Sequence, residues 1–247
     1  MNGHRRIALP LLIMLCGAGI SLSAGAQTTT LCGDLANTFG PHDYRKEAGN
    51  PDAKRSTTNP LFLVESAHFR PEMEALVHGG QGRKSEVGPE LDYTLRAFPN
   101  HHRALLAMTR LADKQKVDQP RGARYSVDCW FERAIRFQAD DGIVRMLYAN
   151  YLGSKGRRDD AIKQLETATQ LAKDNPFSHY NIGMIYADMQ IFDRALAQAH
   201  RASELGMLRT ELKDRLTAAG QWRDPAPSAA AASAAAASAA PASGAGQ

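Results

Sequence analysis

Two cysteines offer the most reactive chemistry in this sequence. Cys16 falls within an apolar N-terminal stretch, which leaves Cys32 and Cys129 as a pair. In an oxidising compartment two such thiols are expected to form a disulfide. The other interpretation is two buried, reduced cysteines that pack as small apolar side chains. Trp130 and Phe131 follow Cys129 directly and favour its burial, which would make it an inert thiol rather than a nucleophile.

Histidine is the other residue type that could support catalysis or metal binding. His101 and His102 are adjacent, and neighbouring residues of a helix point about 100° apart, which makes joint metal ligation awkward. His68 and His78 have no acidic or thiol neighbour at a recognised ligand spacing. We therefore expect solvent-facing histidines, no metal and no cofactor. The sequence also has no Gly-rich phosphate loop and no serine in a nucleophile elbow, so we predict that it is not an enzyme.

The first 26 residues read as a cleavable signal peptide. Arg5 and Arg6 precede an apolar stretch over residues 7–22, and small residues at Ala24 and Ala26 complete the pattern. We predict cleavage after Ala26, a mature protein in the periplasm or secreted, and no membrane insertion after cleavage.

Two other interpretations of the N-terminus remain open. A membrane anchor would need about 20 apolar residues, but this stretch is shorter and Pro10, Gly17 and Gly19 interrupt it. A lipoprotein would be acylated on Cys16, but Leu15 stands where a small residue is expected. Both interpretations are less favoured than export with cleavage.

Charge argues against nucleic acid as the partner. The chain has 30 basic and 26 acidic residues, and the signal segment removes two of the basic ones, which leaves a net charge of +2. These charges are spread along the chain, whereas nucleic-acid binding needs Lys and Arg on one face. Residues 225–247 carry no charge and consist almost entirely of Ala, Ser, Pro and Gly, so we predict a disordered tail, either a spacer or compositional drift.

The middle of the chain contains an internal repeat with a period of 34 residues. Apolar spacing predicts two amphipathic helices per unit, over 142–154 and 159–173, then over 176–188 and 193–205. Glycines near 153–156 end the first of these helices. Small or apolar residues recur in register, with Ala149, Leu152, Ala161, Leu165 and Ala168 matched by Gly183, Tyr186, Ala195, Ala199 and Ala202.

This pattern resembles the tetratricopeptide repeat family. The stretch 180–186 is similar to the first-helix signature of that family, and 192–195 is similar to the start of its second helix. The resemblance implies an all-α fold, a solenoid of helical hairpins. Arg145 and His179 replace the family's aromatic residue, and Lys173 or Met207 stands where a closing proline is common.

The repeat register divides the chain into segments. Residues 27–90 are expected to be irregular and to wrap around the first helices, and a repeat domain covers 91–224. Within that domain we expect a divergent repeat at 100–141 with an insertion over 112–124, regular repeats at 142–175 and 176–209, and a capping helix at 207–219.

The resemblance also implies where a partner would bind. First helices of successive repeats line a concave groove in the family, which corresponds here to Met146, Asn150, Tyr180, Asn181, Met184 and Arg215. Asn150 and Asn181 are 31 residues apart, the offset used by members that hold a peptide carboxylate, but Met146 and Glu211 occupy the lysine positions of that clamp. The implied function is an exported scaffold that binds another protein or peptide and would suit bacterial cell-envelope assembly. The alternative is a thiol-redox accessory or enzyme that uses Cys32 and Cys129.

Overall fold

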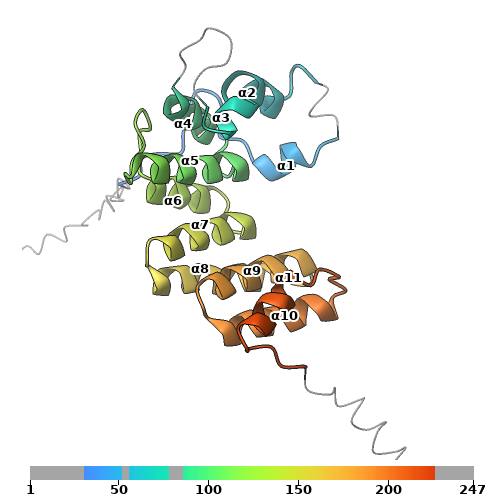
Figure 1. Ribbon diagram of the computed structural model, residues 1–247. Helices are drawn as coiled ribbons and strands as arrows, with labels where there is room; N and C mark the ends of the chain where they lie inside the picture. The colour runs from blue at the N-terminus through green and yellow to red at the C-terminus, as the bar shows by residue number, and fades with distance from the viewer. Residues whose placement is uncertain (1–30, 52–55, 78–85, 226–247) are drawn as a thin grey trace, which may run out of the picture.

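The protein is all-helical. The computed structural model describes residues 31–51, 56–77 and 86–225, and within these ranges it contains α-helices and no strand (Figure 1). The predicted signal peptide, and the predicted tail apart from Pro225, lie outside the described residues. In the described part no helix combines the length and the apolar character needed to cross a membrane.

Eleven helices follow one another in the described residues. The first regular unit coincides closely with its prediction, since its helices begin and end within one residue of the expected positions, and the second unit does the same. The helices are α1 (Tyr44–Ala48), α2 (Pro60–His68), α3 (Pro71–Glu74), α4 (Val87–Ala97), α5 (His102–Gln115), α6 (Val127–Phe137), α7 (Gly142–Ser154), α8 (Arg158–Ala172), α9 (Pro176–Asp188), α10 (Phe192–Glu204) and α11 (Glu211–Ala218).

Local sequence signals explain where the helices begin. Asp141 caps α7, because its carboxylate accepts hydrogen bonds from the backbone N–H groups of Ile143 and Val144. Asn175 caps α9, and Pro176 follows it at the first helical position, where a missing N–H is tolerated. These caps satisfy backbone donors that a helix start would otherwise leave unpaired.

The helices of the two regular units pack as hairpins. α7 pairs with α8 and α9 pairs with α10, while α5, α7, α9 and α11 contact one another in that order. Figure 1 shows these pairs stacked along the molecule, from α4 and α5 towards α10 and α11. Gly156 lies in the turn between α7 and α8 with a φ of 73°, a conformation that glycine adopts without strain.

Two main apolar cores follow the length of the stack. The N-terminal core is centred on α4, α5 and α6 and buries Trp130 and Phe131. The C-terminal core lies between α7 and α11 and contains the small residues of the regular units. Gly183 shows why small residues are needed, since a Cβ added there would lie 2.4 Å from the Leu212 side chain.

Residues 27–90 are less irregular than the sequence suggested. Their described part contains α1, α2, α3 and the start of α4, and its longest non-helical stretch is residues 31–43. Pro60 and Pro71 stand at the first positions of α2 and α3, so these prolines begin helices rather than interrupt them. α2 and α3 pack on α4, α3 also packs on α5, and α1 contacts α2.

Candidate functional site

The groove residues expected from the sequence divide into buried and exposed sets. Met146 and Tyr180 are only 7% and 6% exposed and belong to the C-terminal core. Asn150, Asn181 and Arg215 are exposed, and Met184 is half-buried. Four of the six predicted residues are therefore available to a partner, and two are packing residues.

Helical periodicity explains this division on α9. Phe177, Asn181 and Met184 are spaced by four and three residues, so they lie on one stripe of the helix. Tyr180 is offset by about 100° from Asn181 and points into the core. Its hydroxyl donates a hydrogen bond to Glu211 at 3.0 Å, and burial together with this carboxylate raises the pKa of Tyr180. Tyr180, predicted as a groove residue, is therefore a packing residue of the C-terminal core.

The same stripe occurs on α7. Ile143, Leu147 and Asn150 repeat the spacing of the α9 stripe, and Ile143 stands 34 residues before Phe177. Both side chains are large, apolar and open to solvent, with Ile143 45% and Phe177 59% exposed. We call these six residues, Ile143, Leu147, Asn150, Phe177, Asn181 and Met184, the first-helix face.

The sequence already contained the signal for Ile143 and Phe177. Each lies seven residues before an asparagine or methionine of the predicted groove, Asn150 and Met184, and therefore on the same side of its helix. These two apolar residues were missed because the resemblance to the repeat family implied other positions of the first helices. They are the largest apolar additions that the structure makes to the candidate site.

Polar groups of the first-helix face are available for a ligand. Asn150 and Asn181 make no side-chain hydrogen bond to another described residue. Arg215, in contrast, pairs with Asp188 at the edge of the face. An exposed ion pair of this kind contributes little to stability. The two amides are thus the uncommitted polar groups of the predicted set.

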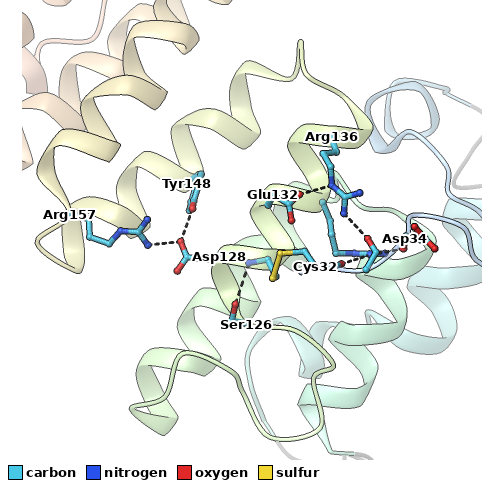
Figure 2. The surroundings of a disulfide bond; sticks show 11 residues. Cys32, Asp34, Ser126, Asp128, Glu132, Arg136, Tyr148 and Arg157 are labelled. Carbon is cyan, nitrogen blue, oxygen red and sulfur yellow. Dashed lines mark hydrogen bonds and ion pairs between the residues drawn. A yellow bond between two sulfur atoms is a disulfide. The ribbon is translucent and has the colours of Figure 1, made fainter. Parts of the chain in front are cut away.

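Cys32 and Cys129 form a disulfide that joins residues 97 positions apart (Figure 2). Cys129 lies in the first turn of α6, where the Ser126 hydroxyl accepts a hydrogen bond from its backbone N–H at 3.3 Å. Cys32 is 8% exposed. The bond fixes the non-helical segment 31–43 to the side of α6.

Two arginines of α6 hold the same segment. Arg133 is fully buried, and its Nη1 donates to the carbonyl oxygens of Cys32 and Asp34 at 2.9 and 2.6 Å. Arg136 donates to the Gly33 carbonyl at 2.7 Å and also pairs with Glu132, as Figure 2 shows. Burial lowers the pKa of Arg133. Three consecutive carbonyls are therefore bound by side chains, a role of Arg133 and Arg136 that the sequence did not reveal.

Glu132 lies beside the disulfide. One of its carboxylate oxygens and the two sulfur atoms lie within 4.8 Å of one another. In the oxidised protein both sulfurs are bonded to each other, so no thiolate is free to bind a metal. The ion pair of Glu132 with Arg136, at 2.7 Å, gives this carboxylate a structural partner.

The histidines are not solvent-facing, which corrects the expectation from the sequence. His101 is fully buried, and His102 is largely buried with its Nε2 2.9 Å from the Asp141 carboxylate. His68 lies 2.6 Å from Glu90. His78 lies outside the described residues. These side chains pair with carboxylates because they sit between elements that the sequence alone does not bring together.

His101 is the cap of α5 rather than a residue within that helix. Its Nδ1 accepts from the backbone N–H of Ala104 at 3.2 Å, and its Nε2 lies 3.1 Å from Glu65. A ring that accepts through Nδ1 and donates through Nε2 is neutral. Burial lowers the pKa of His101, which favours that neutral form.

No family model matches the chain, and no curated protein is significantly similar to it. The similarity to tetratricopeptide repeats therefore rests on the 34-residue period and on the small residues of the two regular units. What the geometry adds is a face of two helices with exposed apolar side chains and uncommitted amides.

Proposed function

We propose that this protein is an exported, tetratricopeptide-like helical scaffold that binds another polypeptide through its first-helix face. The observation that carries the proposal is the exposure of Ile143 and Phe177 at equivalent positions of two adjacent helices, beside Asn150 and Asn181. Apolar side chains gathered on one face of a soluble protein mark interaction sites.

The chemistry of the face suits an extended peptide. Burying an exposed side chain such as Phe177 against a partner stabilises a complex by roughly 1.5–3 kcal/mol before entropic costs. An asparagine amide both donates and accepts, so Asn150 and Asn181 match the alternating N–H and C=O groups of an extended backbone. The combination supports polypeptide binding rather than catalysis.

The contacts of α5, α7, α9 and α11 in sequence support the interpretation of the fold as a helical solenoid. Stacked helical hairpins present such a series of helices as a continuous binding surface. Export is supported by the sequence of the first 26 residues and by the disulfide between Cys32 and Cys129, which is a bond typical of oxidising compartments.

Site-specific photo-cross-linking tests the proposal. A photoreactive phenylalanine analogue is placed at Phe177 or Asn181, and at Lys163 as a control, because Lys163 is exposed on α8. We expect cross-linked protein partners from the first two positions in intact cells and none of these partners from position 163. The proposal fails if positions 177 and 181 give no product that position 163 lacks.

The alternative thiol-redox function is supported less well. Cys32 is buried, and the arginines of α6 hold its carbonyl and those of the two residues that follow it. Exchange requires an attacking thiolate to reach a sulfur, and burial hinders this at Cys32, while Cys129 is half-buried. Titration of free thiols in graded glutathione buffers separates the two functions, since a working disulfide is reduced at the potential of the buffer and a structural one is not.

A further inference from the structure

The turn between α10 and α11 forms a second exposed apolar surface next to Phe177. One hollow of about 350 Å³ is lined by Pro176, Phe177, Met207, Leu208 and Arg209. An adjoining hollow of about 300 Å³ shares Met207, Leu208 and Arg209 with it and reaches Tyr180, Lys213 and Trp222. We call the two together the terminal hollow.

The apolar part of the terminal hollow is unusually open. Leu208 is 91% exposed, the highest value for a large apolar residue of the described part after Leu31. Met207 and Trp222 are half-buried and pack against the C-terminal core, and the ring of Tyr180 lies beneath them. The apolar side chains thus range from exposed Leu208 to buried Tyr180, and together they form a recess into which one side chain of a partner can insert.

The charged part of the terminal hollow is cationic. Arg209 lies over the Tyr180 ring at 5.8 Å, and Lys213 lies over the Trp222 ring at 5.0 Å. Neither forms a salt bridge with a carboxylate of the described residues, and no carboxylate lines either hollow. Glu211 is nearby and accepts the Tyr180 hydroxyl; its own backbone N–H, that hydroxyl and the charge of Arg209 lower the pKa of its carboxylate.

Two other arginines of this end of the molecule are already paired with carboxylates. Arg201 forms a salt bridge with Asp174 at 2.6 Å, and Arg223 forms one with Asp193 at 2.7 Å. Arg209 and Lys213, which line the terminal hollow, form no such salt bridge among the described residues. Their position favours a ligand that carries carboxylates beside an apolar side chain.

We infer that the terminal hollow binds an acidic segment of a protein, one whose aromatic or aliphatic side chain is flanked by Asp or Glu. The apolar side chain enters between Tyr180, Met207 and Trp222, and the flanking carboxylates meet Arg209 and Lys213. The inference rests on the proposed function, because it names the chemistry of the polypeptide that the protein binds. An anionic lipid bilayer carries the same negative charge as an acidic peptide. Its surface is flat, however, whereas a recess favours an inserted side chain.

A peptide titration tests the inference with the full mature chain. The probe is a blocked hexapeptide, acetyl-Glu-Asp-Phe-Glu-Leu-Asp-amide, and its matched control replaces every Glu by Gln and every Asp by Asn. Fluorescence reports on the site, since the chain has two tryptophans and the other, Trp130, is fully buried far along the stack. Calorimetry measures the affinity independently of fluorescence.

We expect the acidic peptide to bind at least about tenfold more tightly than the neutral one, and rising salt to reduce that difference. Arg209→Gln with Lys213→Gln should remove the preference. Arg201→Gln with Arg223→Gln, which changes the same number of cations outside the hollow, should keep it. Circular dichroism confirms that each variant remains helical.

Three results would overturn the inference. These are equal affinity for the acidic and neutral peptides, equal loss in the control variant, or binding to phosphatidylglycerol vesicles without binding to the acidic peptide. Cross-linking from Phe177 and Asn181 tests the proposed function separately. If cross-linking succeeds and the acidic preference is absent, the inference fails while the proposed function stands.

Discussion

The regions before and after Asp141 are stabilised in different ways. Of the ten buried polar or charged residues in the described part, nine lie at or before Asp141 and only His179 lies after it. The first region also contains the disulfide, whereas the second consists of two regular hairpins and α11 with small residues at their contacts.

The difference follows from how each region satisfies its backbone. Residues of regular hairpins pair their own N–H and C=O groups, so only apolar packing remains to be arranged. The non-helical segment 31–43 cannot do this and relies on side chains, as when Arg133 donates to the carbonyls of Cys32 and Asp34 and Arg136 donates to that of Gly33. Irregular chain is therefore held by polar side chains and by a covalent bond.

Removing the disulfide should have the largest effect on the stability of the first region relative to the second. For Cys32→Ser with Cys129→Ser, the chain-entropy treatment of the 97-residue separation gives a loss of about 4–5 kcal/mol, which strain and residual structure in the unfolded chain often reduce. Urea unfolding measures the loss. Hydrogen exchange should show it first in α4, α5 and α6, and an equal loss of protection in α9 and α10 would show that the regions are not distinct.

A larger residue at Gly183 should weaken the second region instead. A Cβ at this position would lie 2.4 Å from Leu212 and 3.2 Å from Gln198, so Gly183→Ala overpacks the contact between α9 and its neighbours. We expect a loss of about 1–3 kcal/mol in the free energy of unfolding. Gly142→Ala is the matched control, because its added Cβ meets only Leu171 at an ordinary 3.5 Å. Equal losses in the two variants would contradict the close approach.

Acidification should weaken the first region through His101. Because burial lowers its pKa below the ordinary value of 6.5, the unfolded chain takes up a proton at a higher pH than the folded protein does. The contribution of His101 to the free energy of unfolding is fully present above about pH 6.5. It falls as the pH drops towards the folded-state pKa, by at most about 1.4 kcal/mol per pH unit. Glu65, His102 and Arg103 face the same ring.

Thermal melts between pH 7.5 and 5.5 measure this dependence. His101→Asn keeps a side-chain cap on α5 but cannot titrate, so its melting temperature should fall less over this range. An unchanged slope in the variant would assign the pH dependence to other groups.

Substitutions of exposed residues of the first-helix face should weaken binding without lowering stability. Asn150→Ala with Asn181→Ala removes two exposed amides and should change the free energy of unfolding by less than about 0.5 kcal/mol. Capture of a partner identified by cross-linking should weaken by about tenfold, equivalent to about 1.4 kcal/mol. Tyr180→Ala is the contrasting variant, because loss of this buried ring should lower stability and binding together. Unchanged capture by the asparagine variant would exclude the two amides from the binding surface.

The order of helices could be predicted from the sequence because the signals that set it are local. Apolar spacing, Gly at the 153–156 turn and the Asn175–Pro176 pair placed α7 to α10 within one residue. The disulfide was predicted as one of two alternatives, on compartment and cysteine count. For residues 27–90 the expectation of an irregular segment missed local start signals, since Pro60 and Pro71 begin α2 and α3.

Tertiary structure alone decided which side of each helix is exposed and which polar groups meet. Tyr180 and Asn181 are neighbours in sequence, yet one is buried against Glu211 and the other is open to solvent, because the position of α11 determines which side of α9 is covered. Arg133 reaches the carbonyls of Cys32 and Asp34 across about a hundred residues. Such contacts depend on how distant segments pack, and no pattern within a single helix contains that information.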